Sequence, residues 1–196
     1  LADPRRVSRA GSTRLSQGGN WIEADLYWDE LSSPQLLGFG IYRGTSPTGP
    51  LSPTDFLRDV YAIFYADLDD ELIEGQTYYY EVSALNTSYP SGPGSESPPS
   101  NRYGVTALGD LTLLSPTFGP LTFRWNAANG AETYTVYVFD RYPGLGVSEI
   151  WQSPATASTS VVGPSLPPGT YYYVALGVAR GGDSRTISPL GTFVMN

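Results

Sequence analysis

The sequence of 196 residues contains no cysteine and no histidine. Without cysteine the chain cannot form a disulfide bond or offer a thiol nucleophile. Without histidine, the Ser–His–Asp and Cys–His nucleophile systems are excluded, and the commonest transition-metal ligand is missing. These two absences argue against catalysis, so we expect a protein that is not an enzyme and needs no cofactor.

Lysine is also absent, and all 11 basic residues are arginines. The net charge is −8 and the isoelectric point is about 4.4. A protein this acidic is a poor partner for nucleic acid, because phosphate binding needs a basic face. No apolar run approaches the roughly 20 residues of a membrane-spanning helix, so we expect no membrane span. If the protein is exported, we expect Leu1 to follow a processing site.

The residues that are abundant favour β-structure. The chain has 15 tyrosines, 4 tryptophans and 7 phenylalanines beside a single methionine, together with 22 glycines and 17 prolines. Aromatic side chains fit a half-buried pleated surface, while glycine and proline interrupt strands at turns. We therefore predict an all-β protein with many loops.

One sequence unit occurs twice. The alternating segment Leu26–Trp28 has a counterpart that ends at Trp125, and Phe39 corresponds to Tyr134 at the start of the next strand. Later, a Leu-x-x-Gly-x-x-Tyr segment ends first at Tyr78 and then at Tyr172. Each of these tyrosines opens a strand whose alternate residues are expected to face the core: Tyr78, Tyr80, Val82 and Ala84 in the first unit, and Tyr172, Val174, Leu176 and Val178 in the second.

These segments, in this order, resemble fibronectin type III domains. The resemblance implies that Trp28 and Trp125 lie at the centres of two cores. It also implies that Tyr78 and Tyr172 are corner tyrosines, whose hydroxyl groups bond to nearby backbone. The fold class that follows is two consecutive fibronectin type III-like (immunoglobulin-like) β-sandwiches.

The repeat and the composition predict where the units begin and end. We expect a basic N-terminal arm at 1–14, a first sandwich at 15–108 and a second at 109–196, placed end to end by a short linker. Between its third and fifth strands the first unit carries an extra stretch. There, apolar residues at helical spacing from Phe56 to Tyr61 predict a short helix capped by Thr54.

Two clusters of acidic residues could bind a metal ion or act in catalysis. The acidic run that contains Asp67, Asp69, Asp70 and Glu71 offers oxygen ligands of the kind that calcium prefers. It lacks the spacing of an EF-hand and stands where the family has a polar turn, so a solvated turn is the favoured interpretation. The adjacent pair Asp29 and Glu30 does not provide the two opposed carboxyl groups of a glycosidase, and we interpret it as surface charge.

The N-terminal arm differs in charge from everything that follows it. Its four arginines are opposed by a single acid, Asp3, and apolar residues at Val7 and Leu15 would allow it to join a sheet edge: the candidate contact residues are Arg5, Arg6, Arg9, Arg14, Val7 and Leu15. Such an arm is complementary to the acidic body of a neighbouring copy.

The function that fits these features is a non-catalytic extracellular or cell-surface structural and adhesion module that contacts protein partners. A second hypothesis is a self-assembling subunit of an extracellular filament or surface layer that uses its arm. A third is a carbohydrate-binding module, because aromatic residues outside the repeated core positions could stack on sugar rings: Trp21, Tyr89, Tyr103, Tyr142 and Trp151.

Overall fold

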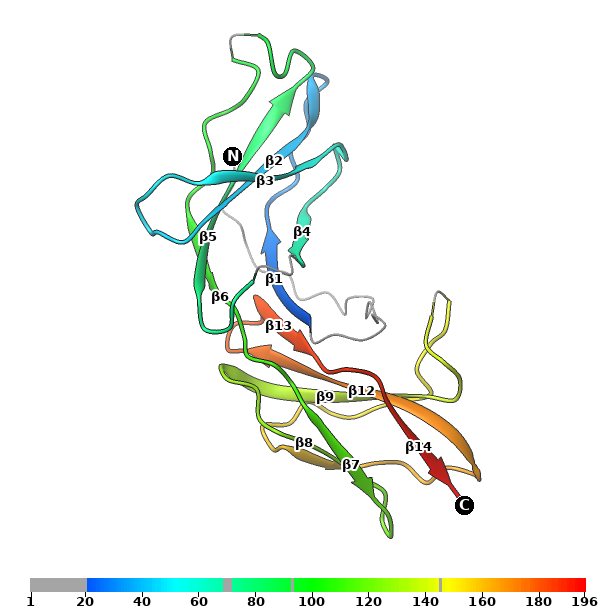
Figure 1. Ribbon diagram of the computed structural model, residues 1–196. Helices are drawn as coiled ribbons and strands as arrows, with labels where there is room; N and C mark the ends of the chain where they lie inside the picture. Colours follow the sequence, from blue (N-terminus) through cyan, green and yellow to red (C-terminus); the bar gives the residue numbers. More distant parts are fainter. Residues whose placement is uncertain (1–20, 69–71, 93, 145) are drawn as a thin grey trace.

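The computed structural model describes residues 21–68, 72–92, 94–144 and 146–196. Over these residues the chain forms fourteen β-strands and no α-helix (Figure 1). Within these residues there is no helix that is long and apolar enough to cross a bilayer. The predicted fold class, two consecutive fibronectin type III-like β-sandwiches, is confirmed.

The first sandwich has six described strands, which are β1 (Trp21–Tyr27), β2 (Leu36–Gly44), β3 (Ser52–Leu57), β4 (Phe64–Asp67), β5 (Thr77–Asn86) and β6 (Tyr103–Thr106). One layer is the sheet β3-β2-β5-β6, and the other is formed by β1 and β4. Trp28 is buried between the layers, where its ring lies 5.3 Å from that of Phe39. Tyr78 and Tyr80 are buried in the same core.

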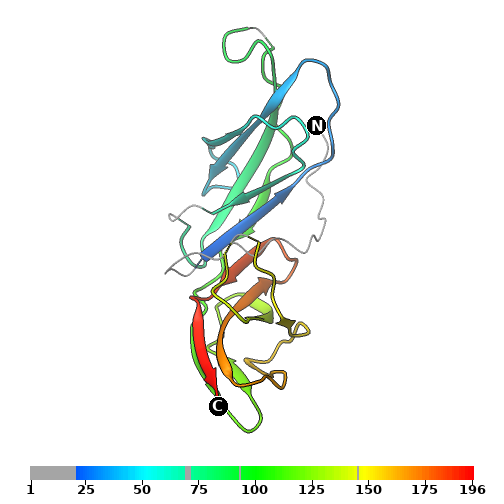
Figure 2. The same cartoon turned by 90° about the vertical axis from the view of Figure 1, so that its right-hand side faces the viewer.

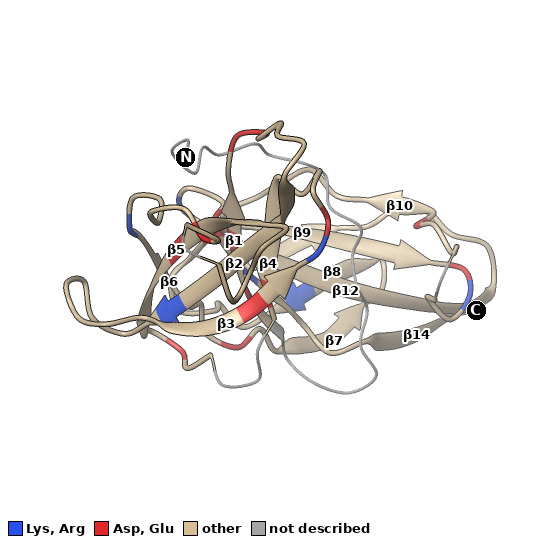
Figure 3. Ribbon diagram, turned by 90° about the horizontal axis from the view of Figure 1, so that it is seen from above, with Lys and Arg blue, Asp and Glu red and all other residues tan. Residues whose placement is uncertain are grey.

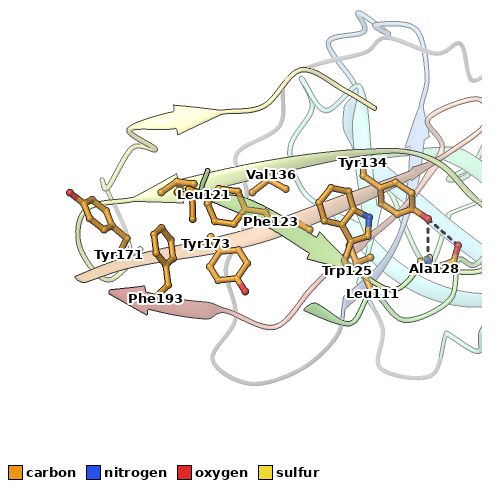
Figure 4. Packing of buried hydrophobic residues seen from close by; sticks show 12 residues of the cluster. Leu111, Leu121, Phe123, Trp125, Ala128, Tyr134, Val136, Tyr171, Tyr173 and Phe193 are labelled. Carbon is orange, nitrogen blue, oxygen red and sulfur yellow. Dashed lines mark hydrogen bonds between the residues drawn. The ribbon is translucent and has the colours of Figure 1, made fainter. Parts of the chain in front are cut away.

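The second sandwich has eight strands, which are β7 (Leu113–Thr117), β8 (Thr122–Trp125), β9 (Ala131–Phe139), β10 (Trp151–Gln152), β11 (Ser160–Val162), β12 (Gly169–Ala179), β13 (Ser184–Ile187) and β14 (Gly191–Met195). The sheet β11-β8-β7 faces a layer built on β9 and β12. Trp125 lies 5.5 Å from Tyr134 at nearly the same tilt as its counterpart in the first core (Figure 4). The tryptophan–aromatic contact is therefore present in both units.

The corner tyrosine of the second unit is Tyr171, so the prediction of Tyr172 was wrong by one residue. In the first unit, the Ile73 backbone N–H donates to the Tyr78 hydroxyl at 2.9 Å. In the second, the Tyr171 hydroxyl donates to the Pro167 carbonyl at 3.0 Å.

The two units differ in how the chain enters the strand that carries the corner tyrosine, which is β5 in the first unit and β12 in the second. Gly75 stands in a turn with φ at +73°, whereas Gly169 already belongs to β12. The second unit thus reaches its tyrosine one residue sooner, and its core face is Tyr171, Tyr173 and Ala175. Tyr172 is half-buried on the opposite face of the sheet.

The predicted helix near Thr54 is also wrong, because residues Ser52–Leu57 form strand β3. Phe56 pairs with Gly40 and Leu57 with Phe39 along the edge of β2. An open edge of β2 offers this segment a row of backbone partners, and that pairing outweighs a local pattern of apolar residues at helical spacing.

The two cores are separate in sequence. One takes its buried residues from Ala24 to Ala107, and the other from Leu111 to Phe193. Figures 1 and 2 show the sandwiches arranged one after the other in an elongated molecule. Two separate cores are what a division at 15–108 and 109–196 would produce, although the bounds themselves stay a prediction.

Candidate functional site

The two sandwiches share a sheet. Strand β13 of the second sandwich lies antiparallel to β1 of the first, with Trp21 opposite Ile187 and Ala24 opposite Ser184. The ladder continues one residue further, where the Asp25 N–H donates to the Asp183 carbonyl at 2.9 Å. One path of strands, β10-β9-β12-β13-β1-β4, therefore runs through both sandwiches. We call the β1–β13 contact the seam.

The seam makes the two repeated units unequal. In the second sandwich, β8 carries Trp125 and has β11 on one side and β7 on the other. In the first, β1 precedes the matching Trp28 and has β4 on one side. Its other side is filled by β13, which comes from the opposite end of the chain. The first sandwich is thus completed, over the described residues, by a strand of the second.

Charged side chains join the same two strands. Arg185 places Nη2 3.0 Å from an Asp25 carboxylate oxygen, and Glu23 lies opposite Arg185 in the ladder. Asp25 is only 2% exposed as a residue, and its side chain is fully buried. A second side-chain contact between the sandwiches comes from β6, where the Tyr103 hydroxyl donates a hydrogen bond to an Asp183 carboxylate oxygen at 2.7 Å. The seam therefore combines backbone pairing with a buried ion pair and a hydrogen bond.

The pKa of Asp25 is raised from its ordinary value near 3.8 to about 8, and burial is the largest cause. A hydrogen bond with Glu23 and the charges of Glu23 and Asp183 contribute to the same increase. The Arg185 guanidinium acts in the opposite direction and lowers it. Three carboxyl groups around one guanidinium make the seam a place where a proton is held near neutral pH.

Asp67, the first residue of the proposed calcium site, already has other partners. Asp67 is buried and faces the first core, where Arg43 donates to it at 2.9 Å and the Tyr80 hydroxyl at 2.8 Å. Asp69, Asp70 and Glu71 lie outside the described residues. Within the described ranges, no group of three or more acidic residues is placed to hold a metal ion.

The candidate contact residues of the arm, Arg5, Arg6, Arg9, Arg14, Val7 and Leu15, also lie outside the described residues. Asp29 and Glu30 are exposed directly after β1, in the loop that follows Trp28. Their position agrees with their interpretation as surface charge.

The aromatic residues proposed for sugar stacking have separate neighbours. Trp151 stacks on Phe123 at 6.0 Å on the core side of the second sandwich. Tyr142 meets Tyr172 edge-on at 5.7 Å on the other face. Tyr89 lies 6.1 Å from Phe56 in the first sandwich, and Tyr103 bonds at the seam. The structure does not bring these residues together as one platform, and the side chain of Trp21 is outside the description.

A group that the sequence reasoning missed lies beside the edge strand β4. Tyr61 is 78% exposed, Ile63 41% and Phe64 40%, and the Phe64 ring contacts that of Tyr27 at 4.8 Å. We call these three exposed residues the β4 apolar group. The signal was available as an uninterrupted apolar run from Val60 to Ala66. The helical interpretation of the preceding segment obscured it.

No family model matches the sequence, and no curated protein matches it either. Among solved structures, the chain is similar to the FN1–FN3 domains of chicken CNTN1, with a TM-score of 0.46 and 12% sequence identity. The alignment covers 88% of this chain and 62% of that one, so this chain spans less than two thirds of that structure's length.

Proposed function

We propose that this chain is a non-catalytic structural and adhesion module, extracellular or at the cell surface, that holds two sandwich domains in a fixed arrangement for contacts with protein partners. The observation that carries the proposal is the seam. Two domains joined only by a linker move relative to one another by default, whereas a β-ladder between them constrains both position and twist.

The contact between Asp25 and Arg185 at the seam supports the same role. Separating β13 from β1 would leave the buried Asp25 carboxyl group without its Arg185 partner, which costs stability because a buried polar group that loses its partner is not resolvated. The pair therefore penalises arrangements in which β13 leaves β1. A fixed relation between two domains suits a spacer, because it sets the distance between whatever binds at either end.

The remaining features fit such a module without further assumptions. A repeated sandwich, an acidic body and the absence of cysteine and histidine describe a scaffold. Acidic positions are spread over loops and strands of both sandwiches, β3 among them (Figure 3). A net charge far from zero keeps such a protein soluble.

A distance measurement between the two domains tests the proposal. Because the chain has no cysteine, spin labels at Ser91→Cys and Ala157→Cys, both exposed positions, report one interdomain distance by double electron–electron resonance. We expect a single narrow distribution that broadens in Arg185→Glu. The matched control is Arg141→Glu, since Arg141 is exposed and, among the described residues, pairs with its neighbour Asp140. A broad distribution in the unmodified background would overturn the proposal.

A second candidate function, self-assembly, is favoured by one observation. The β4 apolar group lies beside a strand that ends the sheet of the described residues, and edge strands are templates for pairing with another chain. The further inference below develops this candidate.

A further inference from the structure

We propose that the open edge of β4 binds the N-terminal residues 1–20 of a second copy of this chain, added as a strand. The inference rests on the proposed function, since it names one protein partner of the module. It is argued from three properties of the edge, which are its backbone geometry, its exposed apolar residues and its charge.

Among the described strands, β4 pairs with β1 on one side and ends the sheet on the other. The Trp28 N–H donates to the Ile63 carbonyl at 3.1 Å, and in the same register Tyr65 lies opposite Leu26. Alternate residues of an antiparallel strand direct their backbone groups to opposite sides. Phe64 and Ala66 therefore direct theirs away from β1, at the end of the strand path.

The side chains next to this edge are apolar and exposed. The β4 apolar group lies on β4 and on the turn before it. The ring of Tyr27 on β1 packs against the ring of Phe64 and extends this apolar surface. An added strand gains affinity from main-chain bonds and specificity from contacts of its alternate side chains. Val7 and Leu15 are the apolar side chains that residues 1–20 bring to such a contact.

The charge around the edge is acidic. Asp29 and Glu30 are exposed directly after Trp28, and Asp59 is exposed in the turn where its carbonyl accepts from the Ala62 N–H. Arg58 is the basic residue of that turn. Residues 1–14 carry four arginines against one acid, which is the opposite balance. Complementary charges of this kind steer association and select the partner.

The matching edge in the second sandwich shows what is specific to β4. Strand β11 lies beside β8 as β4 lies beside β1, and Val162 on it is 58% exposed. The segment around it, residues 154–165, contains no charged residue. Two edges with similar backbones thus differ in charge, so an arginine-rich strand prefers β4.

Sedimentation velocity of the full 196-residue chain over a range of concentrations tests the proposal. We expect reversible association that weakens as sodium chloride is added, because exposed charge pairs are screened. Ala66→Pro removes an N–H that faces the open edge and leaves the ladder to β1 intact, so we expect its dissociation constant to rise by at least about tenfold. Val162→Pro is the matched control, because the Val162 N–H also faces an open edge, and it leaves association unchanged.

A charge exchange keeps the test decisive if Ala66→Pro fails to fold. Arg9→Glu with Arg14→Glu weakens association, and adding Asp29→Arg with Glu30→Arg restores it. The proposal is overturned if the chain is a monomer at every concentration. A monomer is also the expected result if residues 1–20 bind β4 of the same chain, so that alternative overturns the proposal as well. It is overturned equally if Ala66→Pro associates like the unmodified chain. A monomer with a narrow interdomain distance would remove this inference alone and leave the proposed function standing.

Discussion

Replacing Asp25 by asparagine should remove most of the pH dependence of stability between pH 5 and pH 9. The folded-state pKa of Asp25 is about 8, against an ordinary value of 3.8. Between these values the folded chain holds a proton that the unfolded chain releases. The free energy of unfolding therefore falls as the pH rises, and the loss is complete once the pH passes the folded-state pKa.

The structure sets the size of this effect. Each pH unit in the window costs up to about 1.4 kcal/mol, and the window spans about 4 units, which gives an upper bound of about 5–6 kcal/mol. That pKa already contains the opposing effect of the Arg185 guanidinium. About 3 of these units lie between pH 5 and the folded-state pKa, so we expect a fall of up to about 4 kcal/mol between pH 5 and pH 9.

Urea unfolding followed by tryptophan fluorescence at pH 5, 7 and 9 measures this dependence. Asp25→Asn keeps the shape of the side chain and cannot ionise, so its stability should be nearly constant over the range. Asp140→Asn is the control, because Asp140 is exposed and its pKa is lowered by Arg141, which places its titration below the range. Stability that stays constant or rises with pH in the unmodified chain would refute the reasoning, as would an unchanged slope in Asp25→Asn.

Three further predictions, made with four substitutions, concern the second sandwich. Tyr171→Phe should lose about 1 kcal/mol of stability, because it loses a partly buried hydrogen bond to Pro167, whereas Tyr172→Phe should lose almost nothing. Urea unfolding resolves this difference, and the reverse order would contradict the prediction. Phe123→Ala should cost about 3–5 kcal/mol, measured in the same way, because that ring is fully buried. Gly191→Ala should lower the melting temperature, since a Cβ there would lie 2.3 Å from the Tyr173 ring; an unchanged melting temperature would show that the ring can move freely.

The sequence was sufficient for the layers and for the centres of the cores. Large aromatic residues and alternation indicate burial, and the resemblance to fibronectin type III domains implied the core positions of Trp28 and Trp125, both of which are buried. The error at Tyr172 arose because two adjacent tyrosines satisfy the same motif. Only the backbone at Gly169 determines which of them faces the core.

The seam could not be predicted in this way. Strand pairing between distant segments depends on which edges are left open, and a sequence repeat implies that both units close in the same manner. Nothing in the alternation near Glu23 distinguishes a partner in the same sandwich from β13. The β4 edge was missed for a related reason, since its apolar run predicts a strand without saying which of its sides stays unpaired.

The seam also has a consequence for how the chain is made. A ribosome releases β1 well before β13, so the contact between Trp21 and Ile187 cannot form until most of the second sandwich has emerged. Until then the edge of β1 lacks its β13 partner, and the nascent first sandwich is open to the wrong neighbours. Closing so long a loop is slow. The formation of β13 in the second sandwich therefore determines when the first sandwich is completed.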